Sequence, residues 1–311
     1  MPVTVKQLNV YPIKGCKPVT AESAACLGTG LPYDRHWMVV RADSGKFLTQ
    51  RQIPKLCQVC VSLPPEALLA TGWGKLQPGA ALVVSAPGMS QLQVPLTDPA
   101  APAAPAQLKN VTVWEWSGAA ADEGDEAAAW FSKFLGQPVR LVRHLHSSGL
   151  PQTVRPTDPE FAPGHAVKFA DGYPLLVSCE ENLQDLNSHL SSSGSSPLPM
   201  NRFRPNVVLA GFEGGAWADD AWGDVAVGSV QLSYVKPCSR CKVTTIDQET
   251  AEEGKEPLVT LGQFRSGKVL GWAAQRKSWT HNVFFGWNAA VLQQGTISVG
   301  DTVTVTQPRT A

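Results

Sequence analysis

Two cysteines and three cationic side chains lie close together near the end of the chain. Within residues 235–247, Cys238 and Cys241 are three positions apart, and Lys236, Arg240 and Lys242 flank them. A thiolate is a soft, polarisable ligand that suits metals and sulfur chemistry, and neighbouring cations favour the thiolate over the thiol. The alternative is a pair of small buried apolar residues. The pattern therefore predicts a reactive or metal-binding cysteine at the edge of a strand.

The remaining cysteine pattern excludes several common cofactor sites. Cys57 and Cys60 form a second pair with the same spacing, but nearly the whole chain separates the two pairs. A zinc ribbon needs its pairs about 15–20 residues apart, and a thioredoxin motif needs a βαβ context. The sequence also has no Walker loop, haem-attachment motif or ferredoxin spacing. If the protein performs redox chemistry, its electrons must come from outside the chain.

Cationic side chains at strand ends suggest a second kind of chemistry. Lys14 and Arg35 lie in the first half of the chain, and Arg202 and Arg204 lie in the second half. An arginine fork fits a phosphate group, and lysine acts as a point charge. Each of these side chains could instead be an ordinary solvated charge. If the two halves close on one another, the sequence predicts an anionic ligand between them.

Composition narrows the class of protein. The chain has 311 residues, and its 26 cationic and 26 anionic side chains cancel, which gives no indication of nucleic-acid binding. No apolar run reaches the ~20 residues that span a bilayer, and the N-terminus has no signal-peptide core. Seven cysteines are an odd number and form no dense framework. We therefore expect a cytoplasmic protein with reduced thiols and no membrane span.

Short runs of alternating apolar residues predict an α+β, β-rich fold of the barrel or sandwich type. Strands are expected at residues 3–10, 34–40, 46–49, 58–63, 81–85, 91–96, 111–116, 139–142, 203–209, 225–234 and 241–246. Residues 122–135 predict a helix with an acidic first turn and an apolar stripe. A capping box at residues 178–181 predicts a second helix that runs to Leu190. Residues 295–305 predict a terminal hairpin.

Two segments rich in small and turn-forming residues predict the organisation into domains. Residues 97–107 are rich in Pro and Ala and predict a loop. Residues 147–165 are rich in Ser, Pro and Gly, and the domain boundary is predicted there. We therefore expect two domains, at residues 1–150 and 151–311.

Several motifs in order identify a family. They are residues 10–17 (VYPIKGCK), 34–37 (DRHW), 49–52 (TQRQ), 203–206 (FRPN), 237–241 (PCSRC) with Thr244, Thr245 and Asp247, and 300–301 (GD). Over nearly its whole length the chain resembles the MOSC-domain proteins, and among them the eukaryotic amidoxime-reducing components. The resemblance implies an N-terminal β-barrel domain, a following β-rich MOSC domain with a few helices, and a molybdenum cofactor (molybdenum–molybdopterin) between them.

The resemblance also implies roles for individual residues. Cys241 matches the position of the cysteine that binds molybdenum, and Cys238 is not expected to bind the metal. The other positions implied in cofactor binding are Lys14, Gly15, Arg35, Asp171, Gly172, Tyr173, Arg204, Asn206, Cys238, Ser239 and Arg240. This chain has Gly15 where Ser is common in the family, and Gly172-Tyr173 where Thr-Ser is common.

The activity implied is the reduction of small N-hydroxylated compounds, such as amidoximes and hydroxylamines, to amines. The implied electron donors are cytochrome b5 and NADH-cytochrome b5 reductase. Two alternatives remain open at this point. MOSC domains are named for a molybdenum cofactor sulfurase, so Cys241 could carry a persulfide in cofactor maturation, or the protein could carry the cofactor without catalysis.

Overall fold

The computed structural model describes residues 2–69, 76–96, 108–145 and 155–309. Strands dominate these residues, as predicted, so the β-rich fold class is confirmed. In the first half of the chain the strands are β1 (Thr4–Val10), β2 (Val19–Ala21), β3 (Ser23–Cys26), β4 (Trp37–Arg41), β5 (Cys60–Ser62), β6 (Ala81–Ser85), β7 (Leu92–Pro95), β8 (Leu108–Val113), β9 (Trp116–Asp122) and β10 (Val139–Arg143). In the second half they are β11 (Arg155–Pro156), β12 (Ala166–Val167), β13 (Leu175–Cys179), β14 (Val207–Ala210), β15 (Trp222–Val227), β16 (Val230–Ser239), β17 (Phe284–Gln293), β18 (Gly295–Ser298) and β19 (Val303–Pro308).

Helices in the described part of the chain are few and peripheral. The α-helices are α1 (Gly124–Leu135), α2 (Glu180–Ser192) and α3 (Leu258–Phe264). The 3₁₀ turns are η1 (Pro54–Gln58), η2 (Pro65–Leu68), η5 (Met200–Arg202), η6 (Ala218–Ala221), η7 (Lys242–Thr245) and η8 (Lys277–Trp279). Helix α1 confirms the helix predicted at 122–135. Its Trp130, Phe131 and Phe134 are buried, and it ends at Gly136 in the left-handed conformation.

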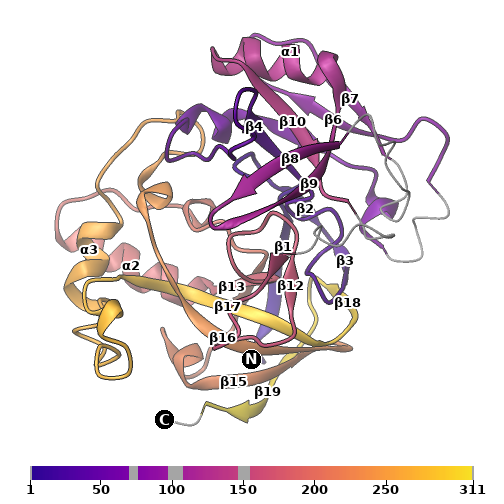
Figure 1. Cartoon of the computed structure of the whole chain (residues 1–311). Helices are drawn as coiled ribbons and strands as arrows, with labels where there is room; N and C mark the ends of the chain where they lie inside the picture. The colour runs from indigo at the N-terminus through magenta and orange to yellow at the C-terminus, as the bar shows by residue number, and fades with distance from the viewer. Residues whose placement is uncertain (1, 70–75, 97–107, 146–154, 310–311) are drawn as a thin grey trace.

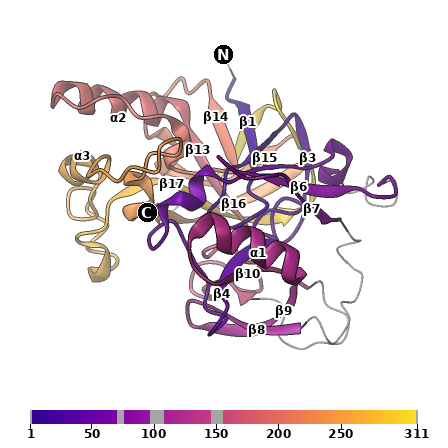
Figure 2. The same ribbon diagram turned by 90° about the horizontal axis from the view of Figure 1, so that it is seen from above.

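One large sheet forms the lower part of the molecule in Figure 1. It has eight strands in the order β19-β15-β16-β17-β13-β14-β1-β2. Helix α2 packs against β13 and β14, and α3 packs against α2, so both helices lie at one side of this sheet (Figure 2). Strands β16 and β17 are ten residues each and form a long antiparallel pair.

Smaller sheets form the upper part of the molecule (Figure 1). Strands β4, β10, β9 and β8 pair in that order, and β5, β6 and β7 form a second sheet. Helix α1 packs against β10 and β7 and so covers the apolar faces of both sheets. The segments on either side of β4 and the turn between β8 and β9 supply part of the site described below, and the loop after β1 of the large sheet supplies Lys14 and Gly15.

Strands from the two halves of the chain pair with each other. Strand β1 pairs with β14 antiparallel, with Leu8 opposite Val207, and β3 pairs with β18. These pairings bring the loop after β1 close to the residues before β14. The division into residues 1–150 and 151–311 stays a prediction, since residues 146–154 lie outside the described part of the chain, as does the predicted loop at 97–107.

The predicted terminal hairpin is wrong. Strands β18 and β19 lie where strands were expected, but β18 pairs with β3 and β19 pairs with β15. Gly300 has φ +89° and turns the chain between them. Local alternation identified the strands, but their partners come from distant parts of the sequence.

Local signals also misplaced other elements: residues 46–49 form no named strand, and the run at 225–234 divides into the antiparallel pair β15 and β16. Residues 111–116 were expected to form one strand, but the chain reverses at Trp114, which joins β8 to β9. Residues 241–246 form the 3₁₀ turn η7 instead of a strand. The predicted capping box is absent, because Ser178 lies in β13 and the N-cap of α2 is Cys179, which makes no side-chain capping bond.

Candidate functional site

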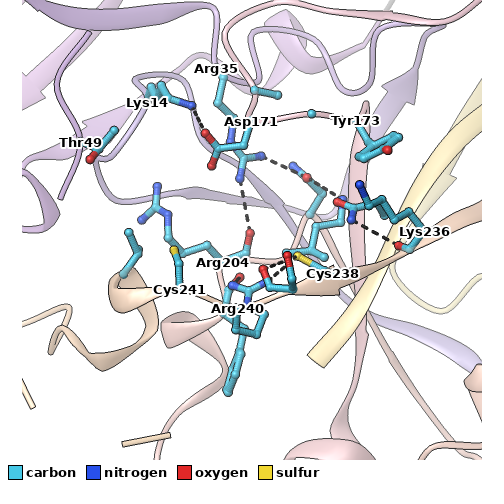
Figure 3. A pocket seen from close by; sticks show the side chains of 18 of the residues that line it. Lys14, Arg35, Thr49, Asp171, Tyr173, Arg204, Lys236, Cys238, Arg240 and Cys241 are labelled. Atoms are coloured by element: carbon cyan, nitrogen blue, oxygen red, sulfur yellow. Dashed lines mark hydrogen bonds and ion pairs between the residues drawn. The ribbon is translucent and has the colours of Figure 1, made fainter. Parts of the chain in front are cut away.

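A cavity of about 560 Å³ lies between the two halves of the molecule. Ligand pockets in proteins commonly have volumes of about 300–1,000 Å³. Its wall contains all twelve residues that the family resemblance implied in cofactor or metal binding, several of which are labelled in Figure 3: Lys14, Gly15, Arg35, Asp171, Gly172, Tyr173, Arg204, Asn206, Cys238, Ser239, Arg240 and Cys241. Tertiary structure thus brings them together from five separate segments.

The charge of the cavity wall is strongly unbalanced. Six cationic side chains line it, namely Lys14, Arg35, Arg51, Arg204, Lys236 and Arg240, whereas Asp171 is the one lining carboxylate among the described residues. Arg51, Arg204 and Arg240 form no ion pair with a carboxylate in the described part of the chain. Uncompensated cations that face one cavity favour an anionic ligand.

Lys14 and Asp171 form an ion pair at the cavity wall. Lys14 Nζ donates to Asp171 Oδ1 at 2.6 Å and to the Phe169 carbonyl oxygen at 2.8 Å. Burial lowers the pKa of Lys14, and the Asp171 carboxylate opposes that effect. The Lys14 ammonium group, together with Arg51 and Arg35, lowers the pKa of Asp171 well below its usual range. Because an ammonium group has three donors, Lys14 keeps one for a ligand.

Asn206 holds Arg35 in place. Asn206 Oδ1 accepts from Arg35 Nη1 at 3.0 Å and from the Leu176 amide at 3.2 Å, while Nδ2 donates to Asp34 Oδ1 at 2.9 Å and to the Asn9 carbonyl at 3.1 Å. An amide side chain offers two acceptor sites and two donors, so all four hydrogen-bonding positions of Asn206 are occupied. Its side chain therefore positions Arg35, which also pairs with Asp34 at 2.6 Å.

Arg35 and Arg204 both have a left-handed backbone, with φ of +44° and +58°. This conformation is costly for a residue with a side chain, and such strain clusters at functional sites. Both guanidinium groups lie over the ring of Tyr11, with centroid distances of 4.3 Å and 4.4 Å. Arg204 also donates to the Cys16 carbonyl oxygen at 2.8 Å. The backbone strain thus directs two cations to one place.

The two cysteines of the 237–241 segment have separate arginine partners. Arg51 Nη2 lies 3.0 Å from Cys241 Sγ, and Arg240 Nη1 lies 2.9 Å from Cys238 Sγ. Cys241 is the N-cap of η7, where the chain leaves β16. Both thiols are free and partly exposed. The arrangement presents two sulfur atoms to the cavity, each beside a cationic donor.

Two buried polar atoms in the wall have no partner among the described residues. They are the Tyr173 hydroxyl oxygen and Arg240 Nε. Burial raises the pKa of Tyr173 above its ordinary value, so its hydroxyl keeps its proton and can donate. A buried donor without an acceptor is costly, and both atoms are covered by protein instead of facing the cavity. Beside Tyr173, a side chain at Gly172 would meet nothing within 4 Å, so this stretch of wall is open.

Comparison with known proteins gives matches to both halves. The MOSC N-terminal beta barrel domain matches residues 2–138, and the MOSC domain matches residues 164–304. The mitochondrial amidoxime-reducing component 1 of Mus musculus is 34% identical over 306 residues, which cover 96% of this chain and 81% of the relative. The human component 1 is 33% identical (96% and 82%), and the human component 2 is 30% identical over 305 residues (96% and 82%). The chain belongs to the MOSC-domain family.

The cavity between the two halves is also lined by residues that the sequence analysis did not assign to the site. Thr49, Gln50, Arg51, Trp114, Lys236 and Asn288 are among them. The first three belong to the 49–52 motif, which carried the family resemblance and could have indicated them. Trp114 had no such signal, because its place in the wall depends on the turn between β8 and β9.

Arg202 lies outside the lining of the MOSC cavity. An expected strand at 203–209 would have placed Arg202 and Arg204 on the same face, but β14 begins only at Val207. Arg202 ends η5 and its guanidinium pairs with Asp247 at 2.8 Å. The two arginines therefore have different surroundings.

No helix in the described ranges of this MOSC protein is long and apolar enough to cross a membrane. The predicted cytoplasmic location stays a prediction.

Proposed function

We propose that this protein is a molybdenum-cofactor-dependent reductase of N-hydroxylated compounds. The observation that carries the proposal is the cavity in which six cations and one carboxylate surround an available cysteine. A phosphorylated pterin is an anion of suitable size for this volume, and a thiolate suits a high-valent metal. The similarity to amidoxime-reducing components along 96% of the chain supports the same assignment.

The residues fit the cofactor in distinct roles. Cys241 would bind the metal, while Lys14, Arg35 and Arg204 would hold the phosphate, with Asn206 and Tyr11 keeping the two guanidinium groups in place. Tyr173 and Arg240 line the same wall and would lie beside the cofactor. Backbone groups at Gly15, Asp171 and Gly172, with those of the 238–240 segment, would complete the wall.

When bound, the molybdenum centre supplies the two-electron chemistry that the protein side chains cannot perform. In the net reaction an amidoxime takes up two electrons and two protons, its N–O bond breaks, and an amidine and water are released. The side chains would bind and orient the cofactor in the cavity that Cys241 lines. Because the sequence has no redox module of its own, we propose that cytochrome b5, reduced by NADH through its reductase, delivers the electrons.

Reconstitution tests this function. The purified, molybdenum-loaded protein is mixed with cytochrome b5, its reductase, NADH and benzamidoxime, and benzamidine is measured by chromatography with each component omitted in turn. We expect product only in the complete mixture. A loaded protein that forms no product with any reduced donor would contradict the reductase and favour a cofactor carrier. Oxidation of NADH by the protein alone would contradict the need for an external donor.

A further inference from the structure

Arg51 connects the two halves of the molecule at one sulfur atom. Its Nη2 lies 3.0 Å from the Sγ of Cys241, which is 190 residues later in the chain. Arg51 belongs to the half that matches the MOSC N-terminal beta barrel domain, and Cys241 belongs to the half that matches the MOSC domain. The cysteine proposed to bind the metal therefore has a cationic hydrogen-bond donor from the other half.

The backbone around Arg51 is fixed on both sides. The Arg51 amide donates to Thr49 Oγ1 at 3.1 Å, and the Thr49 amide donates to Gln52 Oε1 at 3.0 Å, which closes a compact turn. Gln50 is buried, and its Nε2 donates to the Gly15 carbonyl at 2.6 Å and to Gln248 Oε1 at 3.0 Å. A donor on so constrained a turn loses little freedom when it holds a partner.

Trp114 restrains the Arg51 side chain. The Arg51 guanidinium carbon lies 5.0 Å from the centroid of the Trp114 ring, within the range of a cation–π contact. Trp114 has φ +55° at the tip of the β8–β9 hairpin, a position where glycine or asparagine is usual. Its side chain is 39% exposed. Trp114 also packs edge-to-face against Phe47, with ring centroids 4.9 Å apart, so its ring is held in place beside Arg51.

We propose that Arg51 is a positioning residue that donates a hydrogen bond to the Cys241 sulfur when that sulfur binds the metal. This inference rests on the proposed function. A cationic donor withdraws electron density from a thiolate, which weakens its donation to the metal and favours the reduced states. It also fixes the direction in which the sulfur presents its lone pairs. Arg51, in the N-terminal half, would thereby adjust the reduction potential of a metal bound by Cys241 in the C-terminal half.

Arg51→Met tests this role, because methionine keeps much of the length of the side chain but cannot donate. We expect a shifted molybdenum(V) electron paramagnetic resonance signal and a lower reduction potential. Because the sulfur is no longer held in one direction, we also expect about 10- to 100-fold weaker retention of molybdenum, as for other partners of metal ligands. Arg51→Lys keeps the charge and should restore the signal and the retention in part. None of these measurements depends on turnover.

Arg41→Met is the matched control. Arg41 lies in the same half, on β4, and pairs with the exposed Asp43 at 2.9 Å, away from the cavity. Its loss should leave the signal, the potential and the retention unchanged. An Arg51→Met protein with the wild-type signal and retention would overturn the inference. If Arg51→Met retains too little molybdenum for a spectrum, retention in Arg51→Lys decides: partial recovery supports the inference, and retention as low as in Arg51→Met overturns it.

A result that contradicts the proposed function can be distinguished from one that contradicts only the role of Arg51. Wild-type protein that contains neither molybdenum nor pterin after expression in a cofactor-producing host would contradict the proposed function itself. Wild-type protein that holds the cofactor, together with an Arg51 variant that is indistinguishable from it, would contradict only the role of Arg51.

Discussion

Arg35 and Arg204 are 169 residues apart in the chain, yet their guanidinium carbons lie 4.3 Å and 4.4 Å from the centroid of the same ring, that of Tyr11. Two like charges this close repel each other. The π-electrons of the ring offset part of that repulsion, and an anion in the cavity would offset more. Burial raises the pKa of Tyr11 to about 12, so its hydroxyl stays neutral and donates to the Pro205 carbonyl at 3.2 Å.

Replacing Tyr11 separates the role of its ring from that of its hydroxyl. Tyr11→Phe keeps the ring and loses one hydrogen bond, which should cost about 1 kcal/mol of unfolding free energy and leave cofactor retention unchanged. Tyr11→Leu removes both cation–π contacts and should cost roughly 2 kcal/mol or more, with faster release of pterin. Urea denaturation and pterin fluorescence measure the two effects. Equal pterin release from both variants would show that the ring has no role.

Arg204 and Arg202 provide a matched pair for the anion site. Arg204→Ala should lower cofactor retention, because its guanidinium lines the cavity without a carboxylate partner in the described residues. Arg202→Ala removes a pair with Asp247 outside the cavity lining and should lower stability while cofactor is retained. Molybdenum and pterin per protein are measured after gel filtration. Equal retention in both variants would remove Arg204 from the site.

Cys241 and Cys238 differ in their expected roles although both line the cavity. Cys241→Ala should lose molybdenum and amidoxime reduction, since it removes the proposed metal ligand. Cys238→Ala should keep the metal and much of the activity. Mass spectrometry measures the molybdenum content of each variant, and the reconstituted assay measures its activity. An inactive Cys238→Ala protein beside a normal Cys241→Ala protein would reverse the assignment.

Asp219, which is not among the cavity-lining residues, should make the stability of the protein depend on pH. It is buried, and burial raises its pKa from 3.8 to about 6, although it accepts from Asn182 Nδ2 at 2.9 Å and from Cys179 Sγ at 3.4 Å. Asp220 adds to the rise, and Arg265 opposes it. Because the folded state binds the proton more tightly, this contribution to stability is full below pH 3.8 and is lost as the pH rises through 6.

The contribution of Asp219 amounts to roughly 3 kcal/mol between the two limits, at 1.36 kcal/mol for each pKa unit. Asp219→Asn should remove that component of the pH dependence of the free energy of unfolding, measured in urea from pH 4 to pH 7. The exposed Asp43→Asn serves as the control, since its neighbour Arg41 is also exposed. An unchanged slope in Asp219→Asn would show that Asp219 does not titrate in this range.

The sequence by itself determined the elements whose signals are local. The apolar stripe of residues 122–135 specifies α1, since Trp130, Phe131 and Phe134 recur at helical spacing. The alternation in residues 81–85 specifies β6. The ordered motifs also carried the family resemblance, and that resemblance implied the residues of the site. All twelve of those residues line one cavity.

Only the tertiary structure decided which distant segments meet. Strands β18 and β19 alternate like a hairpin, yet they pair with β3 and β15, because strand partners depend on which apolar faces the whole chain can bury together. The Arg51–Cys241 contact likewise joins residues 190 positions apart. Nothing in the spacing of either motif specifies that distance. The packing of the two halves brings these residues together, because loops from both halves line the same cavity.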